Sequence, residues 1–174
     1  MTEDQARGLA LSLTRIFEVL KTNFQDVNPR FFAEGAFMLL MVNLNDVLRG
    51  LSAAELRVNF NDDLTKGDVT DLIANVRNAI CHVGSPQRHV DENSNSLSFC
   101  VMVGAGVLAK INDIEIGNPY QDDVAFFYGK YRVLLKRHIH KAFVEATKRL
   151  KDKANTENWQ GVTFFLNDIK IAAH

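Results

Sequence analysis

Apolar residues recur every three or four positions in four long segments of the chain, which is the spacing of one buried helix face. These segments predict helices at about 3–26, 29–51, 66–83 and 119–153. Asn28-Pro29 and Asn118-Pro119 stand at the start of the second and the fourth, and proline suits the first turn of a helix. The first helix illustrates the pattern with Leu9, Leu13, Ile16, Phe17, Leu20 and Phe24.

A different pattern separates the third helix from the fourth. Residues 97–103 are β-prone, and residues 110–116 alternate polar and apolar side chains with period two. Gly104 and Gly106 lie between them, so a hairpin over about 97–116 is expected. We therefore predict a mainly α fold, an antiparallel helical bundle with a small β-hairpin insertion between the third and fourth long helices. The tail, 156–174, is expected to dock as a strand or a short helix.

Polar residues form a second stripe on the predicted third helix. At about 100° per residue its four members fall within about 60° of arc, whereas Arg77 lies about 140° from His82. His82 ends the helix before Gly84, Ser85 and Pro86, and a cation there interacts well with the helix dipole. The stripe is made of Asp71, Asn75, Asn78 and His82. In the second helix, Asn43, Asn45 and Asp46 interrupt the apolar pattern. They are either satisfied polar groups near an exposed edge, or they line a site or an interface with the third helix.

Composition limits the class of protein. A chain of 174 residues that is 47% hydrophobic has enough material for a single domain, 1–174. Cys81 and Cys100 are too few for a disulfide framework and are expected to be buried thiols of a reducing compartment. No signal-peptide pattern and no apolar run of membrane-spanning length occurs, so a cytoplasmic protein that does not contact a membrane is expected.

Charge is distributed unevenly, although the net charge is only −1. Residues 1–127 hold 10 Lys and Arg against 17 Asp and Glu, while residues 128–153 hold 9 against 2. One basic helix favours a local phosphate-binding surface over general coating of a duplex. A solvated helix face is the equally good alternative. The candidate contacts to an RNA backbone are Lys130, Arg132, Lys136, Arg137, His140 and Lys141.

Metal binding is not expected, and neither is any other cofactor. His138 and His140 diverge by about 160° on a helix, and no cysteine cluster completes a site.

The segment Arg77-Asn78-Ala79-Ile80-Cys81-His82 resembles the R-x4-H signature of the HEPN superfamily, with a polar residue directly after the arginine. The resemblance implies a helical bundle that cuts RNA without metal, with Arg77 and His82 as catalytic residues and Asn78 in support. It further implies a homodimer with a shared site, a toxin–antitoxin or phage-defence role, and an antitoxin or other partner protein. Some members carry a tyrosine two residues after the histidine as a modification site. Gly84 stands there in this chain, which puts that control mechanism in doubt.

The residue types suit such chemistry. RNA is cut without metal when its own 2′-OH attacks the neighbouring phosphate, leaving a 2′,3′-cyclic phosphate and a 5′-hydroxyl. Histidine can act as acid or base near neutral pH, and arginine stays protonated and binds phosphate oxygens in a fork. One chain offers one imidazole, so a symmetric dimer joined near the second and third helices would supply two.

Two alternatives stay open. The chain is either a non-catalytic HEPN-like module that binds nucleotide, RNA or a protein, or a bundle unrelated to the superfamily. In the first case the motif would remain as a structural helix cap and dimer contact. In the second, Arg77 would be an ordinary surface arginine and His82 a helix-end histidine that stabilises the helix dipole.

Overall fold

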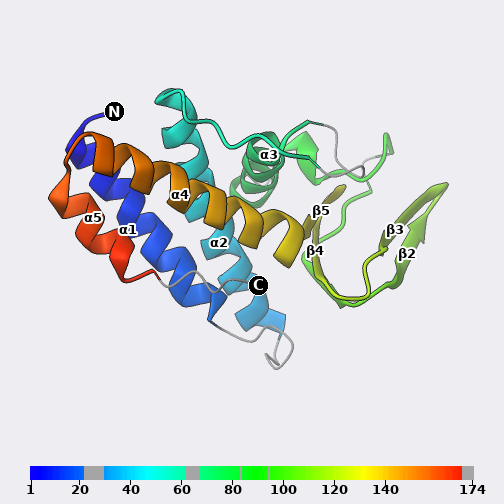
Figure 1. The fold of residues 1–174 in the computed structure, drawn as a ribbon. Coiled ribbons are helices and arrows are strands. Elements are labelled where there is room, and N and C mark those ends of the chain that lie inside the picture. The colour runs from blue at the N-terminus through cyan, green and yellow to red at the C-terminus, as the bar shows by residue number, and fades with distance from the viewer. Residues whose placement is uncertain (22–29, 62–66, 83, 94, 170–174) are drawn as a thin grey trace.

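The computed structural model describes residues 1–21, 30–61, 67–82, 84–93 and 95–169. Within these residues five α-helices and five strands are found (Figure 1). The helices are α1 Glu3–Leu20, α2 Arg30–Ala53, α3 Val69–Cys81, α4 Lys141–Thr156 and α5 Gln160–Asn167. The strands are β1 Cys100–Val103, β2 Gly106–Ile111, β3 Ile114–Asn118, β4 Val124–Tyr128 and β5 Tyr131–Leu134. A 3-10 turn, η1, covers Pro86–Arg88, and a π-helix, η2, covers Leu135–His140.

The prediction of a mainly α bundle is wrong, because the fold is α+β. The strands form two antiparallel sheets, one of order β1-β4-β5 and one made of β2 and β3. Figure 1 shows the helices packed on one side of the three-stranded sheet, with the β2–β3 ribbon at the far side. Four of the predicted segments extend beyond the described residues: the first helix at 22–26, the second at 29, the third at 66 and 83, and the tail at 170–174.

The predicted hairpin over 97–116 has the wrong pairing. Its first strand, β1, pairs with β4, with Cys100 opposite Phe127. Its second half belongs to the β2–β3 hairpin, which turns between Ile111 and Ile114. Gly104, with φ of 74°, follows the end of β1, and no paired strands flank it as a hairpin turn. The local alternation of polar and apolar residues identified the β-prone segments but did not determine which strands pair.

The predicted helix 119–153 is wrong over its first half, where β4 and β5 form a hairpin. Every residue of β4 is buried, because one face of the strand packs on the helices and the other on the β2–β3 ribbon. Such a strand has no polar face, so its apolar run cannot be told from a helix by periodicity. Gly129, with φ of 57°, supplies the left-handed turn before Tyr131. A side chain there would collide with the Gln87 carbonyl oxygen.

Three phenylalanines join the helices to the sheet. Phe37 of α2 lies with its ring centroid 4.8 Å from that of Phe126 in β4 and 5.5 Å from that of Phe99. All three side chains are fully buried. Aromatic pairs of this kind add about 0.5–1.5 kcal/mol beyond the burial of their area. The sheet is therefore part of the main core.

Two polar side chains organise the junction of β5, η2 and α4. The buried carboxylate of Asp123 accepts hydrogen bonds from the backbone N–H groups of Val124, Lys136 and Arg137, at 2.8, 2.9 and 3.2 Å. The buried His138 accepts the Leu134 N–H at its Nδ1 atom, 3.1 Å away. The bonds from Lys136 and Arg137 satisfy backbone donors that the start of η2 leaves without partners. No described helix has the length and apolar character that crossing a bilayer requires.

Candidate functional site

The start of α3, the helix that carries the R-x4-H segment, is held by polar contacts. Asp68 is the N-cap and accepts the Asp71 N–H at 3.0 Å. Arg57 donates to both carboxylate oxygens of Asp68 at 2.8 and 2.9 Å and to Asp71 at 2.8 Å. The buried Thr70 hydroxyl donates to the Val58 carbonyl at 2.6 Å. This end of the helix is thereby fixed to the segment that follows α2.

The ion pair moves the pKa of both partners. Burial acts to raise the pKa of the Asp68 carboxyl, but hydrogen bonds from Arg57 and the Asp71 backbone, with the charge of Arg57, bring it below its usual value. Hydrogen bonds to Asp68 and Asp71 raise the pKa of Arg57. Both groups are therefore charged over the physiological range of pH.

The other end of α3 is open. His82 is the C-cap, with an extended backbone, and its N–H donates to the Asn78 carbonyl at 3.1 Å. Its side chain is exposed. Asn78 and His82 line one shallow hollow together with Ser85, Pro86 and Gln87. Two of the three predicted catalytic residues thus face the same space.

Arg77, the third predicted catalytic residue, does not line this hollow. Its Nη1 atom donates to the Asn78 side-chain oxygen at 3.3 Å, while its Nε is buried and has no hydrogen-bond partner within the described residues. On a regular helix Arg77 starts about 140° from His82. Its long side chain nevertheless reaches Asn78, so the guanidinium contacts a residue of the hollow.

The polar stripe predicted on α3 divides into two halves. The Asp71 carboxylate accepts a hydrogen bond from Arg57, and the side-chain oxygen Oδ1 of Asn75 accepts one from Gln87 Nε2 at 3.0 Å. On α2, Asn43 and Asn45 are buried and donate to atoms of their own helix, Leu39 O and Asp46 Oδ1. These bonds fit the interpretation as satisfied polar groups.

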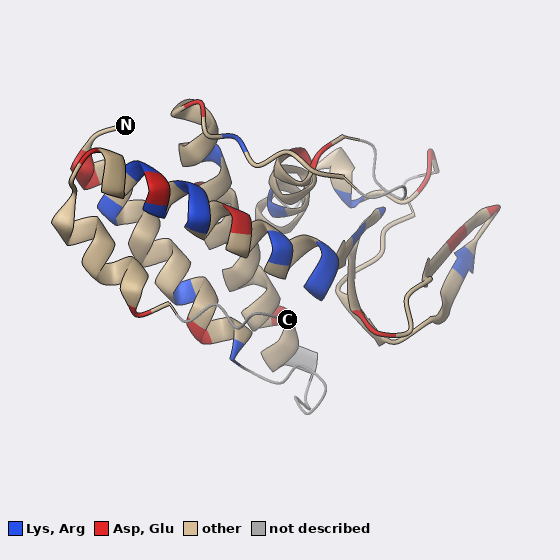
Figure 2. Ribbon diagram, in the orientation of Figure 1, with Lys and Arg blue, Asp and Glu red and all other residues tan. Residues whose placement is uncertain are grey.

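The six predicted RNA-binding residues do not share one helix. Lys130 lies in the β4–β5 turn, Arg132 in β5, the next three in η2, and Lys141 begins α4. Figure 2 shows basic residues along η2 and α4 with acidic residues between them on α4. The surface is therefore assembled from several elements, and its role in RNA binding stays a prediction.

Several of these cations have intramolecular partners. Arg137 pairs with Asp122 and Asp123 at 3.0 Å each and lies 3.8 Å from the Tyr120 ring centroid. Its hydrogen bond to Asp122, partly opposed by desolvation, raises the pKa of the guanidinium. Lys141 lies 4.2 Å from the Phe60 ring centroid. Lys130, in contrast, is exposed and lines a cavity.

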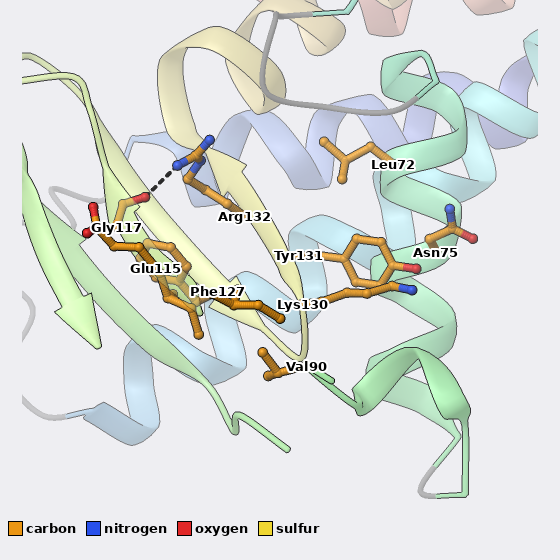
Figure 3. Close-up of a pocket in the computed structure, with 11 residues that line it drawn as sticks. Leu72, Asn75, Val90, Glu115, Gly117, Phe127, Lys130, Tyr131 and Arg132 are labelled. Atoms are coloured by element: carbon orange, nitrogen blue, oxygen red, sulfur yellow. Dashed lines mark hydrogen bonds between the residues drawn. The ribbon is translucent and has the colours of Figure 1, made fainter. Parts of the chain in front are cut away.

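A deeper pocket, with a volume of about 410 Å³, lies between α3, the β4–β5 hairpin and the β2–β3 ribbon. Figure 3 shows the Tyr131 ring and the Lys130 side chain extending toward Asn75 across it. The pocket was not predicted, because the sequence pattern placed residues 119–134 in a helix. Its lining includes Leu72, Asn75, Val90, Ile116, Phe127, Lys130, Tyr131 and Arg132.

The described residues contain no cluster of three or more metal-ligating side chains. His138 points one ring nitrogen at the Leu134 backbone, so its position reflects a structural role. Cys81 is exposed and Cys100 is half-buried, so the expectation that both thiols are buried is wrong for Cys81.

Comparisons of the chain with models of known protein families, with curated proteins and with solved structures found no match. The chemistry of the site itself is therefore what bears on function.

Proposed function

We propose that this protein is a metal-independent endoribonuclease of the HEPN type, with His82 and Arg77 as catalytic residues and Asn78 in support. The observation that carries the proposal is the shared hollow of Asn78 and His82, which leaves the imidazole exposed to a substrate. Because Arg77 donates a hydrogen bond to the Asn78 side chain, its guanidinium places a positive charge next to that hollow.

The proposed reaction follows from these groups. The RNA 2′-OH attacks the neighbouring phosphate, one imidazole accepts its proton, and another donates a proton to the leaving 5′-oxygen. The arginine stabilises the charge that develops on the phosphate oxygens. The Nε atom of Arg77 is buried and has no hydrogen-bond partner within the described residues. Buried donors are normally paired, so we expect this one to gain an acceptor when the site binds RNA or is joined by a second copy of the chain.

A second copy of the chain is the proposed source of the second imidazole. The outer face of α2 carries two exposed apolar side chains, Phe32 and Leu39, which are 65% and 45% exposed. They are seven residues apart, which places them on one helix face two turns from each other. We expect a homodimer in sedimentation experiments, and the change Leu39→Glu to shift it toward monomer. A monomeric wild type would contradict the shared site.

The decisive test is an RNA cleavage assay in EDTA with wild type, His82→Ala and the control His89→Ala. His89 follows η1 and does not line the hollow, so this control keeps the same chemical change elsewhere. Wild type and His89→Ala should release 2′,3′-cyclic phosphate ends, and His82→Ala should not. Equal cleavage by His82→Ala would remove the catalytic assignment.

A toxin–antitoxin or phage-defence role, with a partner protein that holds the enzyme in check, belongs to the same proposal and rests on the family resemblance alone. Expression of wild type and of His82→Ala in cells tests it. Growth arrest that requires His82 supports this role.

The second candidate is a non-catalytic module that binds a nucleotide or RNA. The 410 Å³ pocket favours it, since cavities of about 300–1,000 Å³ commonly hold small ligands. RNA binding without cleavage by wild type would favour this reading over the enzyme.

A further inference from the structure

We propose that the pocket between α3 and the β4–β5 hairpin binds one nucleotide of a single-stranded RNA, with the base against Tyr131 and the phosphate near Lys130. The inference rests on the proposed function in assigning the nucleotide to the RNA that is cut. It extends that function by naming a second subsite, outside the R-x4-H segment, that would position the strand.

The pocket suits a base in size and in the character of its walls. Its volume of about 410 Å³ comes with side chains of Leu72, Val90 and Ile116 that form apolar surface. The Tyr131 ring is half-buried, and burial raises the pKa of its hydroxyl, so the ring is neutral at physiological pH. A neutral aromatic ring beside an apolar wall is the usual platform on which an unpaired base stacks.

The charge at the mouth of the pocket suits a phosphate. The Lys130 ammonium lies 5.7 Å from the Tyr131 ring centroid, and the lysine is exposed. In Figure 3 both side chains extend toward Asn75. A base on the ring would therefore place its phosphate within reach of this cation.

A hydrogen bond of Asn75 connects the pocket with the hollow that His82 lines. Gln87 borders the hollow, Asn75 borders the pocket, and the two side chains share a hydrogen bond of 3.0 Å. In that bond the side-chain oxygen Oδ1 of Asn75 is the acceptor, so the side-chain NH2 is the group that a base acceptor would meet. Asn75 and His82 are seven residues apart, about 10 Å along the helix axis. The pocket and the hollow therefore lie beside successive turns of α3, and we expect a strand seated in the pocket to extend toward the imidazole.

The test measures binding separately from cleavage. A labelled single-stranded RNA with 2′-O-methyl groups cannot be cut through 2′-OH attack, and its Kd follows from fluorescence anisotropy. The variants are Tyr131→Ala, Tyr131→Phe and Lys130→Ala. Lys110→Ala is the matched control, because Lys110 is exposed in β2 and does not line the pocket.

We expect Tyr131→Ala to raise the Kd about tenfold, since one stacked base is lost. Tyr131→Phe keeps the ring and should bind within about twofold of wild type. Lys130→Ala should raise the Kd about threefold and reduce its salt dependence, while Lys110→Ala should do neither. The exposed Lys130 provides a test even if Tyr131→Ala fails to fold, which circular dichroism would reveal.

Competition identifies the ligand. Adenosine monophosphate should displace the labelled RNA, and inorganic phosphate at the same concentration should not. A mononucleotide that binds in preference to the oligonucleotide would assign the pocket to a free nucleotide and overturn its role as an RNA subsite. Equal competition by phosphate, unchanged binding by both Tyr131→Ala and Lys130→Ala, or no RNA binding by wild type would overturn the proposal.

The two proposals can fail separately. Binding that requires Tyr131, without cleavage by wild type, would keep the subsite and remove the enzyme. Cleavage that requires His82, with binding independent of Tyr131 and Lys130, would do the reverse.

Discussion

The two ends of α3 have opposite characters. At its start Asp68, Asp71 and Thr70 all have intramolecular hydrogen-bond partners, from Arg57 and the backbone. At its end the side chain of His82 is exposed and lines an open hollow with Asn78. Only 13 residues separate the cap at one end from the cap at the other.

This difference suggests that the start of α3 contributes to the stability of the fold and that its end contributes to activity. Polar groups that are paired inside the protein hold a helix in place, and removing one partner leaves the other desolvated without compensation. An exposed residue at a helix end has little to lose in stability and is available to a ligand. Changes at the start of α3 should therefore affect folding, and changes at its end should affect activity.

The largest effect is expected at the open end. His82→Ala should reduce RNA cleavage at least about a hundredfold, the usual scale for loss of an acid–base group. The free energy of unfolding in urea should change by less than about 0.5 kcal/mol, as for other surface substitutions. A large loss of stability in this variant would show that His82 is structural and would end the contrast between the two ends.

The next effect is on stability at the anchored end. Asp68→Ala removes an N-cap, at about 1 kcal/mol, and charged hydrogen bonds to Arg57, at about 1.5 kcal/mol, so a loss of about 2–3 kcal/mol is expected. Asp68→Asn keeps a capping side chain and should lose less. Urea unfolding of both variants measures the difference, and equal losses would mean that the cap contributes nothing.

The pH dependence of stability sharpens the same contrast. Because the pKa of Asp68 is lower in the folded than in the unfolded chain, the unfolded chain binds more protons in the acid range. The stabilisation is therefore complete above the unfolded pKa of about 3.9 and is lost as the pH falls through the lower folded pKa. In Asp68→Asn the free energy of unfolding should fall less steeply below about pH 4 than in wild type. If the free energies of unfolding of wild type and Asp68→Asn changed in parallel with pH, the contribution of the Arg57–Asp68 ion pair would be contradicted.

The smallest effect is expected at Thr70. Thr70→Val leaves the Val58 carbonyl without its 2.6 Å donor and should cost about 1 kcal/mol. Thr70→Ser retains the hydroxyl and is the matched control, so it should keep the part of the stability that the hydrogen bond provides. Cleavage should be unaffected in both variants. A loss of cleavage at equal stability would show that the two ends of α3 are coupled.

Part of the candidate site could be predicted from the sequence. The positions of Asn78 and His82 on one face followed from their spacing of four residues, which is a local property of any helix. The bond from Arg77 to Asn78 was not predicted, since a helical wheel gives the direction of the Cα–Cβ bond and not the reach of a long side chain. The pocket was missed altogether, because Asn75, Val90 and Tyr131 come from three separate elements.

The sequence by itself determined the features that depend on neighbouring residues. α1, α2 and α3 lie where the apolar spacing predicts helices, and Asp68 caps α3 as its residue type favours. The tertiary structure alone decided that residues 124–134 form a hairpin, that β1 pairs with β4, and that the basic residues spread over four kinds of element. β4 is buried on both faces, so its sequence carries no alternation, and strand pairing is chosen by partners far away in the chain.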